Sequence, residues 1–162
     1  MRPVPLPMRP SADRRTVWGM PATGPLPPLR VLIADPHLAF RSAARALLRT
    51  EGLDVVADLG HDERVVELVT TLRPDVALID VSPYRSDGLE LARRVAALPH
   101  PPAVVLMSSA RADTLAPAVD GAAACVPKAG LTAAAIARAA ALAEQAPLRV
   151  QPQTSSDWST VR

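Results

Sequence analysis

The sequence has very few aromatic residues and only one cysteine. Its 162 residues include two Trp, one Tyr and one Phe, so a core has to be built from Ala, Val, Leu and Ile. Cys125 has no second cysteine to pair with, which excludes an internal disulfide and fits a reducing compartment. No apolar run reaches the roughly 18 residues that a membrane-spanning helix needs. The N-terminus is basic, but prolines interrupt the apolar region that a signal peptide would need, so we do not expect a signal peptide. We therefore expect a cytoplasmic protein without a membrane segment.

The sequence also lacks a concentrated basic region in its central part. The formal net charge is +2, but residues 1–30 hold five Arg against one acid, whereas residues 31–145 hold eleven basic residues against fourteen acids. A mildly acidic central part is not typical of a nucleic-acid-binding domain. Residues 1–28 are rich in Pro and Arg and show no periodicity, which predicts a disordered arm. We expect one folded domain over residues 29–145 and a flexible tail over residues 146–162.

Apolar patterning predicts five strands that alternate with five helices. The expected strands are Leu29–Asp35, Leu53–Asp58, Val76–Ile79, Ala103–Met107 and Ala123–Val126, and the expected helices are about Leu38–Thr50, Asp62–Leu72, Gly88–Leu98, Ala112–Val119 and Leu131–Gln145. Pro117 lies inside the fourth helix, which should therefore be short or kinked. Strands that alternate with helices form a parallel sheet covered on both faces. The fold class expected is α/β, a doubly wound five-stranded parallel sheet.

Polar residues close four of the five predicted strands: Asp35, Asp80, Ser108 and Lys128. The carboxyl ends of parallel strands meet at one edge of a sheet, where ligands and chemistry gather. Two carboxylates, a hydroxyl and an ammonium suit phosphoryl transfer, because one carboxylate can form an acyl phosphate and the other can help to hold Mg²⁺. The hydroxyl and the ammonium can bind phosphoryl oxygens. A purely structural role for all four is disfavoured, since buried Asp and Lys are costly without partners.

Several segments resemble the receiver domain of two-component response regulators, and more closely the LuxR-like branch. The segments are Val31–Asp35 with His37, Leu72–Asp80, Asp87–Glu90, Val105–Ser109 and Gly121–Lys128. The resemblance covers about residues 29–145, and the spacing of the strand-end residues is close to that of the family. It implies a flavodoxin-like receiver fold.

By this resemblance, Asp80 accepts a phosphoryl group from a sensor histidine kinase. Asp35, Asp80 and the backbone carbonyl of Ser82 hold Mg²⁺, while Ser108 and Lys128 contact the phosphate. The face made by the fourth helix, fifth strand and fifth helix is expected to bind an output partner or a second copy of the chain. At most the protein is a self-phosphorylating phosphoacceptor, with no separate enzymatic activity.

The sequence departs from the family at positions that matter for this chemistry. Pro36 stands where a second acid usually follows Asp35, so we expect weaker Mg²⁺ binding and slower phosphorylation. Cys125 replaces the aromatic residue common at the switch position and should pack as a small hydrophobe. Pro83 lies one residue earlier than the usual proline, which alters the loop after Asp80.

Two main interpretations stay open, an active receiver and a phosphorylation-independent pseudo-receiver that binds proteins. No second helical pattern follows Gln145, so no DNA-binding domain is expected in this chain, and a truncated transcriptional response regulator is a further alternative. An unrelated flavodoxin-like enzyme is disfavoured, because the sequence has no Gly-rich phosphate loop.

Overall fold

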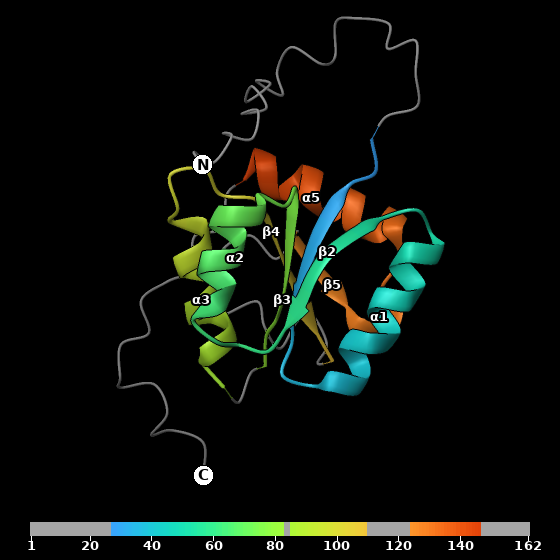
Figure 1. Ribbon diagram of the computed structural model, residues 1–162, viewed down its shortest axis with the longest axis horizontal. Coiled ribbons are helices and arrows are strands. Elements are labelled where there is room, and N and C mark those ends of the chain that lie inside the picture. The colour runs from blue at the N-terminus through green and yellow to red at the C-terminus, as the bar shows by residue number, and fades with distance from the viewer. Residues whose placement is uncertain (1–26, 83–84, 110–123, 147–162) are drawn as a thin grey trace, which may run out of the picture.

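A computed structural model describes residues 27–82, 85–109 and 124–146. Within these ranges the chain forms a parallel sheet flanked by helices (Figure 1). Residues 1–26 and 147–162, which hold nearly all of the predicted arm and tail, lie outside the described residues. The predicted fourth helix with Pro117, and Pro83, lie outside them as well.

The described elements follow the predicted alternation closely. The strands are β1 (Arg30–Ala34), β2 (Asp54–Leu59), β3 (Val76–Asp80), β4 (Ala103–Ser108) and β5 (Cys125–Pro127), and the helices are α1 (Leu38–Thr50), α2 (Arg64–Leu72), α3 (Asp87–Ala96), the short 3₁₀ helix η4 (Lys128–Gly130) and α5 (Ala133–Gln145). The sheet order is β2-β1-β3-β4-β5, and every pairing is parallel. The predicted doubly wound α/β class is confirmed.

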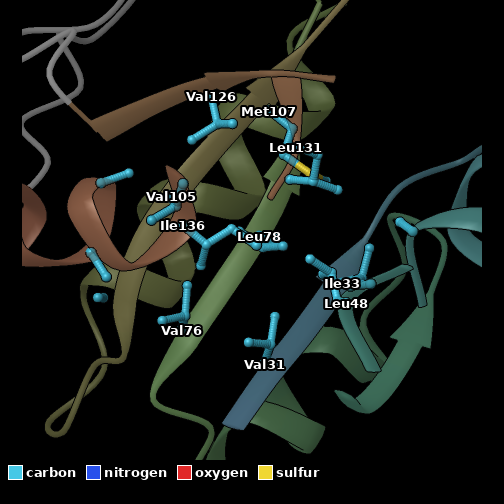
Figure 2. Close-up of a cluster of buried hydrophobic side chains, with 14 of the residues drawn as sticks. Val31, Ile33, Leu48, Val76, Leu78, Val105, Met107, Val126, Leu131 and Ile136 are labelled. Atoms are coloured by element: carbon cyan, nitrogen blue, oxygen red, sulfur yellow. The ribbon is translucent and has the colours of Figure 1, made fainter. Parts of the chain in front are cut away.

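The sheet separates two apolar clusters because side chains alternate along each strand. Val31 and Ile33 of β1 point to the face covered by α1 and α5, whereas Leu32 and Ala34 point to the face covered by α2 and α3. Figure 2 shows the first cluster, in which Leu48 of α1 and Ile136 of α5 pack on the central strands. β3 is buried along its whole length, so both layers of helices cover the strand that carries Asp80.

Helix termini differ from the expected boundaries for local reasons. α2 begins at Arg64 rather than Asp62, because the Asp62 carboxylate accepts a hydrogen bond from the Arg64 backbone N–H at 3.0 Å. α5 begins at Ala133 rather than Leu131, because Thr132 caps it by accepting from the Ala135 N–H at 3.1 Å. Leu131 is instead an extended residue buried in the core.

The end of α1 agrees with the prediction that Gly52 terminates it. Gly52 has φ +88°, a left-handed conformation that costs glycine little. The Gly52 N–H donates to the Arg49 carbonyl at 3.1 Å and the Leu53 N–H donates to the Leu48 carbonyl at 2.9 Å. These two bonds form a Schellman motif, which turns the chain from α1 into β2.

Candidate functional site

Asp35 and Asp80 meet at the carboxyl edge of the sheet because their strands are neighbours. Ala34 at the end of β1 lies opposite Ile79 of β3. The residues that follow these two, Asp35 and Asp80, therefore lie next to each other. The Asp35 side chain is fully buried, and that of Asp80 is 11% exposed. The Asp35 backbone N–H is held by the Leu59 carbonyl of β2 at 2.9 Å. The carboxylate of Asp80 is therefore the one that an external reactant can reach.

Lys128 joins the two carboxylates. Its Nζ lies 2.5 Å from Asp35 Oδ2 and 2.7 Å from Asp80 Oδ1, and its side chain is 11% exposed. Burial alone would lower the pKa of Lys128, but the hydrogen bonds to Asp35 and Asp80 outweigh it and hold this pKa above its usual value. Lys128 is the single lysine of the chain. It stays protonated at neutral pH and neutralises much of the negative charge of the pair.

Phe40 of α1 places an aromatic ring against Lys128 and was not predicted to belong to the site. Lys128 Nζ lies 4.4 Å from the centre of the Phe40 ring, which is a cation–π contact. The sequence placed Phe40 only within the predicted helix Leu38–Thr50 and gave it no role in the site. Nothing in the sequence links Phe40 to Lys128, because the two are 88 positions apart.

His37 and Arg41 hold the turn that follows Asp35. The His37 backbone N–H donates to Asp35 Oδ1 at 2.8 Å, and His37 Nδ1 lies 3.1 Å from the same oxygen. The Arg41 guanidinium donates to the Asp35 carbonyl at 2.6 Å. Pro36 lies exposed between these residues and offers no side-chain oxygen. At this turn, Asp35 thus supplies a carboxylate, Pro36 supplies no ligand atom where a second acid is usual, and His37 supplies an imidazole one residue later.

The remaining predicted site residues occupy the same edge. Ser108 ends β4, is buried, and lies opposite Pro127, the residue before Lys128. Ser82 follows β3 by two residues, and its carbonyl accepts a long hydrogen bond of 3.3 Å from the Arg85 N–H.

Cys125, the predicted switch position, lies in β5 and packs half-buried against the cluster beneath α2 and α3. Burial raises the pKa of its thiol. The side chain therefore packs as the small hydrophobe that the sequence predicted.

A contact between α3 and β3 positions the Asp80 backbone. A Cβ added at Gly88 would lie 2.1 Å from the Asp80 carbonyl oxygen, so only glycine allows this approach. His61, which the sequence reasoning did not single out, lies beside it: its Nε2 is 3.3 Å from the Ala34 carbonyl and its Nδ1 is 3.6 Å from Asp87 Oδ2. Despite burial, which opposes ionisation, the Gly88 N–H, Arg85 and His61 hold the pKa of Asp87 below its usual value.

A family model for the response regulator receiver domain matches residues 31–139. The chain belongs to this family. It is 34% identical over 93 residues to the transcriptional regulatory protein PdtaR of Mycobacterium tuberculosis, an alignment that covers 57% of this chain and 45% of the relative. The chain thus spans about half the length of that relative.

Solved structures agree on the fold. The signal receiver domain of a modulated diguanylate cyclase from Desulfovibrio desulfuricans G20 aligns with TM-score 0.55 at 25% identity, over 72% of this chain and 93% of that one. The receiver domain of a response regulator named NarL from Mycobacterium tuberculosis aligns with TM-score 0.52 at 24% identity, over 73% and 94% of the two chains. The flavodoxin-like receiver fold expected from the sequence is confirmed.

Receiver domains bind Mg²⁺ at acidic residues and interact with histidine kinases. This receiver has an acidic cluster at the carboxyl edge of its sheet, where ligand atoms of Asp35, His37 and Asp80 lie within 4.8 Å of one another. The set fits Mg²⁺ only in part, because one of the three donors is an imidazole and Lys128 already pairs with both carboxylates. Among the described residues, no helix has the length and apolar character needed to cross a bilayer.

Proposed function

We propose that Asp80 is the phosphoacceptor of this receiver and that a sensor histidine kinase is the donor. The observation that carries the proposal is the pairing of a partly accessible Asp80 with Lys128 beside a fully buried Asp35. An Asp80 carboxylate oxygen attacks the phosphorus, the bond from phosphorus to the donor imidazole breaks, and an acyl phosphate remains on Asp80. The donor histidine leaves as a neutral imidazole after it takes up a proton.

Each neighbour has a role in stabilising the transferred group. When Asp80 becomes an acyl phosphate, its carboxylate charge is lost and the negative charge lies on the phosphoryl oxygens. Lys128 then pairs with one of these oxygens. The Ser108 hydroxyl donates a hydrogen bond to a second phosphoryl oxygen. Asp35, Asp80 and the Ser82 carbonyl would hold a divalent cation, whose charge would offset the negative charge of the phosphoryl group. We place the reaction in the cytoplasm, in keeping with a chain whose one cysteine suits a reducing compartment.

Pro36 is proposed to slow this chemistry. The acid usual at this position would add an oxygen ligand next to Asp35, whereas proline adds none. With fewer oxygen donors, Mg²⁺ should bind more weakly and phosphorylation should need higher Mg²⁺ concentrations.

The output is proposed to pass through the face that includes β5 and α5. Ser108 pairs with Pro127 of β5, and Lys128 directly follows β5. A movement of either side chain on phosphorylation of Asp80 would therefore shift the end of β5, which belongs to this face. An output partner or a second copy of the chain is the proposed occupant. Transcriptional regulation, which the name of PdtaR states for that protein, is a proposal here.

A second candidate function is that of a pseudo-receiver, a protein-binding module that works without phosphorylation. It is favoured by Pro36 and by an ammonium that already satisfies both carboxylates. The two candidates predict opposite results in one experiment.

The test is to incubate the protein with Mg²⁺ and acetyl phosphate and to measure its intact mass. We expect a phosphate adduct in the wild type and none in Asp80→Asn. Asp62→Asn, a change at an exposed carboxylate in the loop before α2, serves as the matched control and should keep the adduct. A folded wild type that forms no adduct at saturating Mg²⁺ would support the pseudo-receiver and refute the phosphoacceptor.

Pro36→Asp tests the role of the missing acid. The variant should bind Mg²⁺ about tenfold or more tightly, because it regains a carboxylate ligand at the edge of the pocket. Mg²⁺ titration by calorimetry measures this directly, and acetyl phosphate should then modify Asp80 at lower Mg²⁺ concentrations. An unchanged Mg²⁺ affinity would show that Pro36 is not what limits the pocket.

A further inference from the structure

The mouth of the pocket carries a mixed nitrogen and oxygen donor set. Asp35, His37 and Asp80 each present a ligand atom, and these atoms lie within 4.8 Å of one another. Mg²⁺ prefers six oxygen ligands and keeps much of its water, so an imidazole adds little to its binding. First-row transition-metal cations bind imidazole and carboxylate together, with affinity that rises along the series to copper. The donor set therefore matches the family's usual cation, Mg²⁺, only through its two carboxylates, while the imidazole favours a different cation.

The position of His37 follows from the turn that contains Pro36. Proline fixes the backbone angle φ, and the His37 backbone N–H is anchored on Asp35 Oδ1 at 2.8 Å. The ring lies against the same carboxylate, with Nδ1 3.1 Å from Oδ1. The His37 side chain is 70% exposed, so its ring can rotate onto a cation without disturbing the core.

Lys128 and His37 use different oxygens of Asp35. The ammonium contacts Oδ2 at 2.5 Å, whereas the imidazole contacts Oδ1. On Asp80, the ammonium contacts Oδ1 at 2.7 Å. A cation can therefore be held between Asp35 Oδ1, Asp80 and the imidazole while Lys128 keeps its position.

We propose that this pocket binds a first-row transition-metal cation of the Co²⁺ or Zn²⁺ type in preference to Mg²⁺, with His37 as its nitrogen ligand. The proposal deepens the proposed function, since it uses the pocket of the phosphoacceptor and names the cation that would serve it. Pro36 and His37 then act together: one removes the oxygen ligand that suits Mg²⁺ and the other supplies a nitrogen ligand.

The test is a titration of the metal-free full chain with Co²⁺ and, separately, with Mg²⁺. Calorimetry gives both affinities, and the visible absorption of Co²⁺ reports a change of its ligands. The variants are His37→Ala and, as the matched control, His100→Ala at an exposed histidine that follows α3. Circular dichroism verifies that each variant is folded.

The proposal expects that His37→Ala weakens Co²⁺ binding about tenfold or more and changes the Co²⁺ spectrum, while Mg²⁺ affinity stays within about twofold. His100→Ala should behave as the wild type. The proposal is overturned if His37→Ala binds Co²⁺ as tightly as the wild type, if it loses both cations equally, or if the wild type binds Co²⁺ no better than Mg²⁺. The adduct on Asp80 is a separate measurement, so a chain that binds Co²⁺ through His37 but forms no adduct would refute the phosphoacceptor alone.

Discussion

Replacing Lys128 with Met tests whether its ammonium is what allows two carboxylates to share a buried pocket. Met keeps the length of the side chain and removes its charge. Nζ lies within 2.7 Å of both carboxylates, and the Asp35 side chain is fully buried. Removing one partner of a buried ion pair costs about 3–5 kcal/mol, a large share of the roughly 5–15 kcal/mol that stabilises a typical domain. We expect a loss of that size in the free energy of unfolding at pH 7.5.

The loss should depend on pH in a definite direction. Without Lys128, the proximity of Asp35 and Asp80 disfavours the second negative charge, so at least one carboxyl pKa rises in the folded variant. A folded state with a raised carboxyl pKa binds more protons than the unfolded state, and its stability therefore improves as the pH falls toward the unfolded pKa near 4. The deficit relative to the wild type should shrink by about 1 kcal/mol or more between pH 7.5 and pH 5.5.

Urea denaturation at the two pH values, in buffer with a chelator so that no cation replaces the ammonium, measures the effect. Arg138→Met, at an exposed position of α5, is the matched control and should change stability by less than about 0.5 kcal/mol. The double variant Lys128→Met with Asp80→Asn should recover much of the loss, because one of the two charges is gone. A deficit below about 1 kcal/mol, or one that is the same at both pH values, would refute the reasoning.

Two further substitutions test the surroundings of the site. Gly88→Ala would place a Cβ 2.1 Å from the backbone oxygen of Asp80, so it should lower the free energy of unfolding, measured by urea denaturation, by about 1–3 kcal/mol. Gly60→Ala, whose Cβ would meet no atom within 4 Å, is the control. Equal effects of the two substitutions would argue against the close approach of Gly88 to Asp80. Phe40→Leu removes the aromatic face 4.4 Å from the ammonium and should lower the pKa of Lys128, although Asp35 and Asp80 still hold this pKa above its usual value. Labelled lysine gives a single NMR signal to titrate. The stabilisation from the raised pKa is complete below the unfolded pKa and is lost as the pH rises through the folded pKa, so this loss should be complete at a lower pH in the variant than in the wild type. An unchanged pKa of Lys128 would show that Phe40 does not act on the ammonium.

The sequence predicted the strand-end positions well because each depends on a local pattern. The buried run Val76–Ile79 ends at a carboxylate, and the observed β3 ends at Asp80. Parallel strands bring their carboxyl ends to one edge whatever their order, so the expected convergence of Asp35, Asp80 and Lys128 needed no knowledge of that order. Helix boundaries were less accurate, since single capping side chains such as Thr132 move them by two residues.

Contacts between distant segments were outside the reach of sequence patterns. The Glu51 carboxylate at the end of α1 accepts a hydrogen bond from the Ala133 N–H at the start of α5, although 82 positions separate them. The ring of Phe40 above Lys128 is a contact of the same kind. The first contact needs α1 and α5 on the same face of the sheet (Figure 1), and the second needs α1 beside η4 at the end of β5. The apolar periodicity of the separate elements leaves both placements undetermined.

By itself, the sequence determined which residues form strands and helices, that the sheet is parallel, and which polar residues end its strands, because these properties follow from side-chain period and chain connectivity. Only the tertiary structure decided which partners each polar group has. The order β2-β1-β3-β4-β5 makes Asp35 and Asp80 neighbours, and the turn of η4 beyond the end of β5 brings the Lys128 ammonium to both. Burial makes these pairings important for stability, because a charge removed from water destabilises the folded state unless an oppositely charged partner lies beside it.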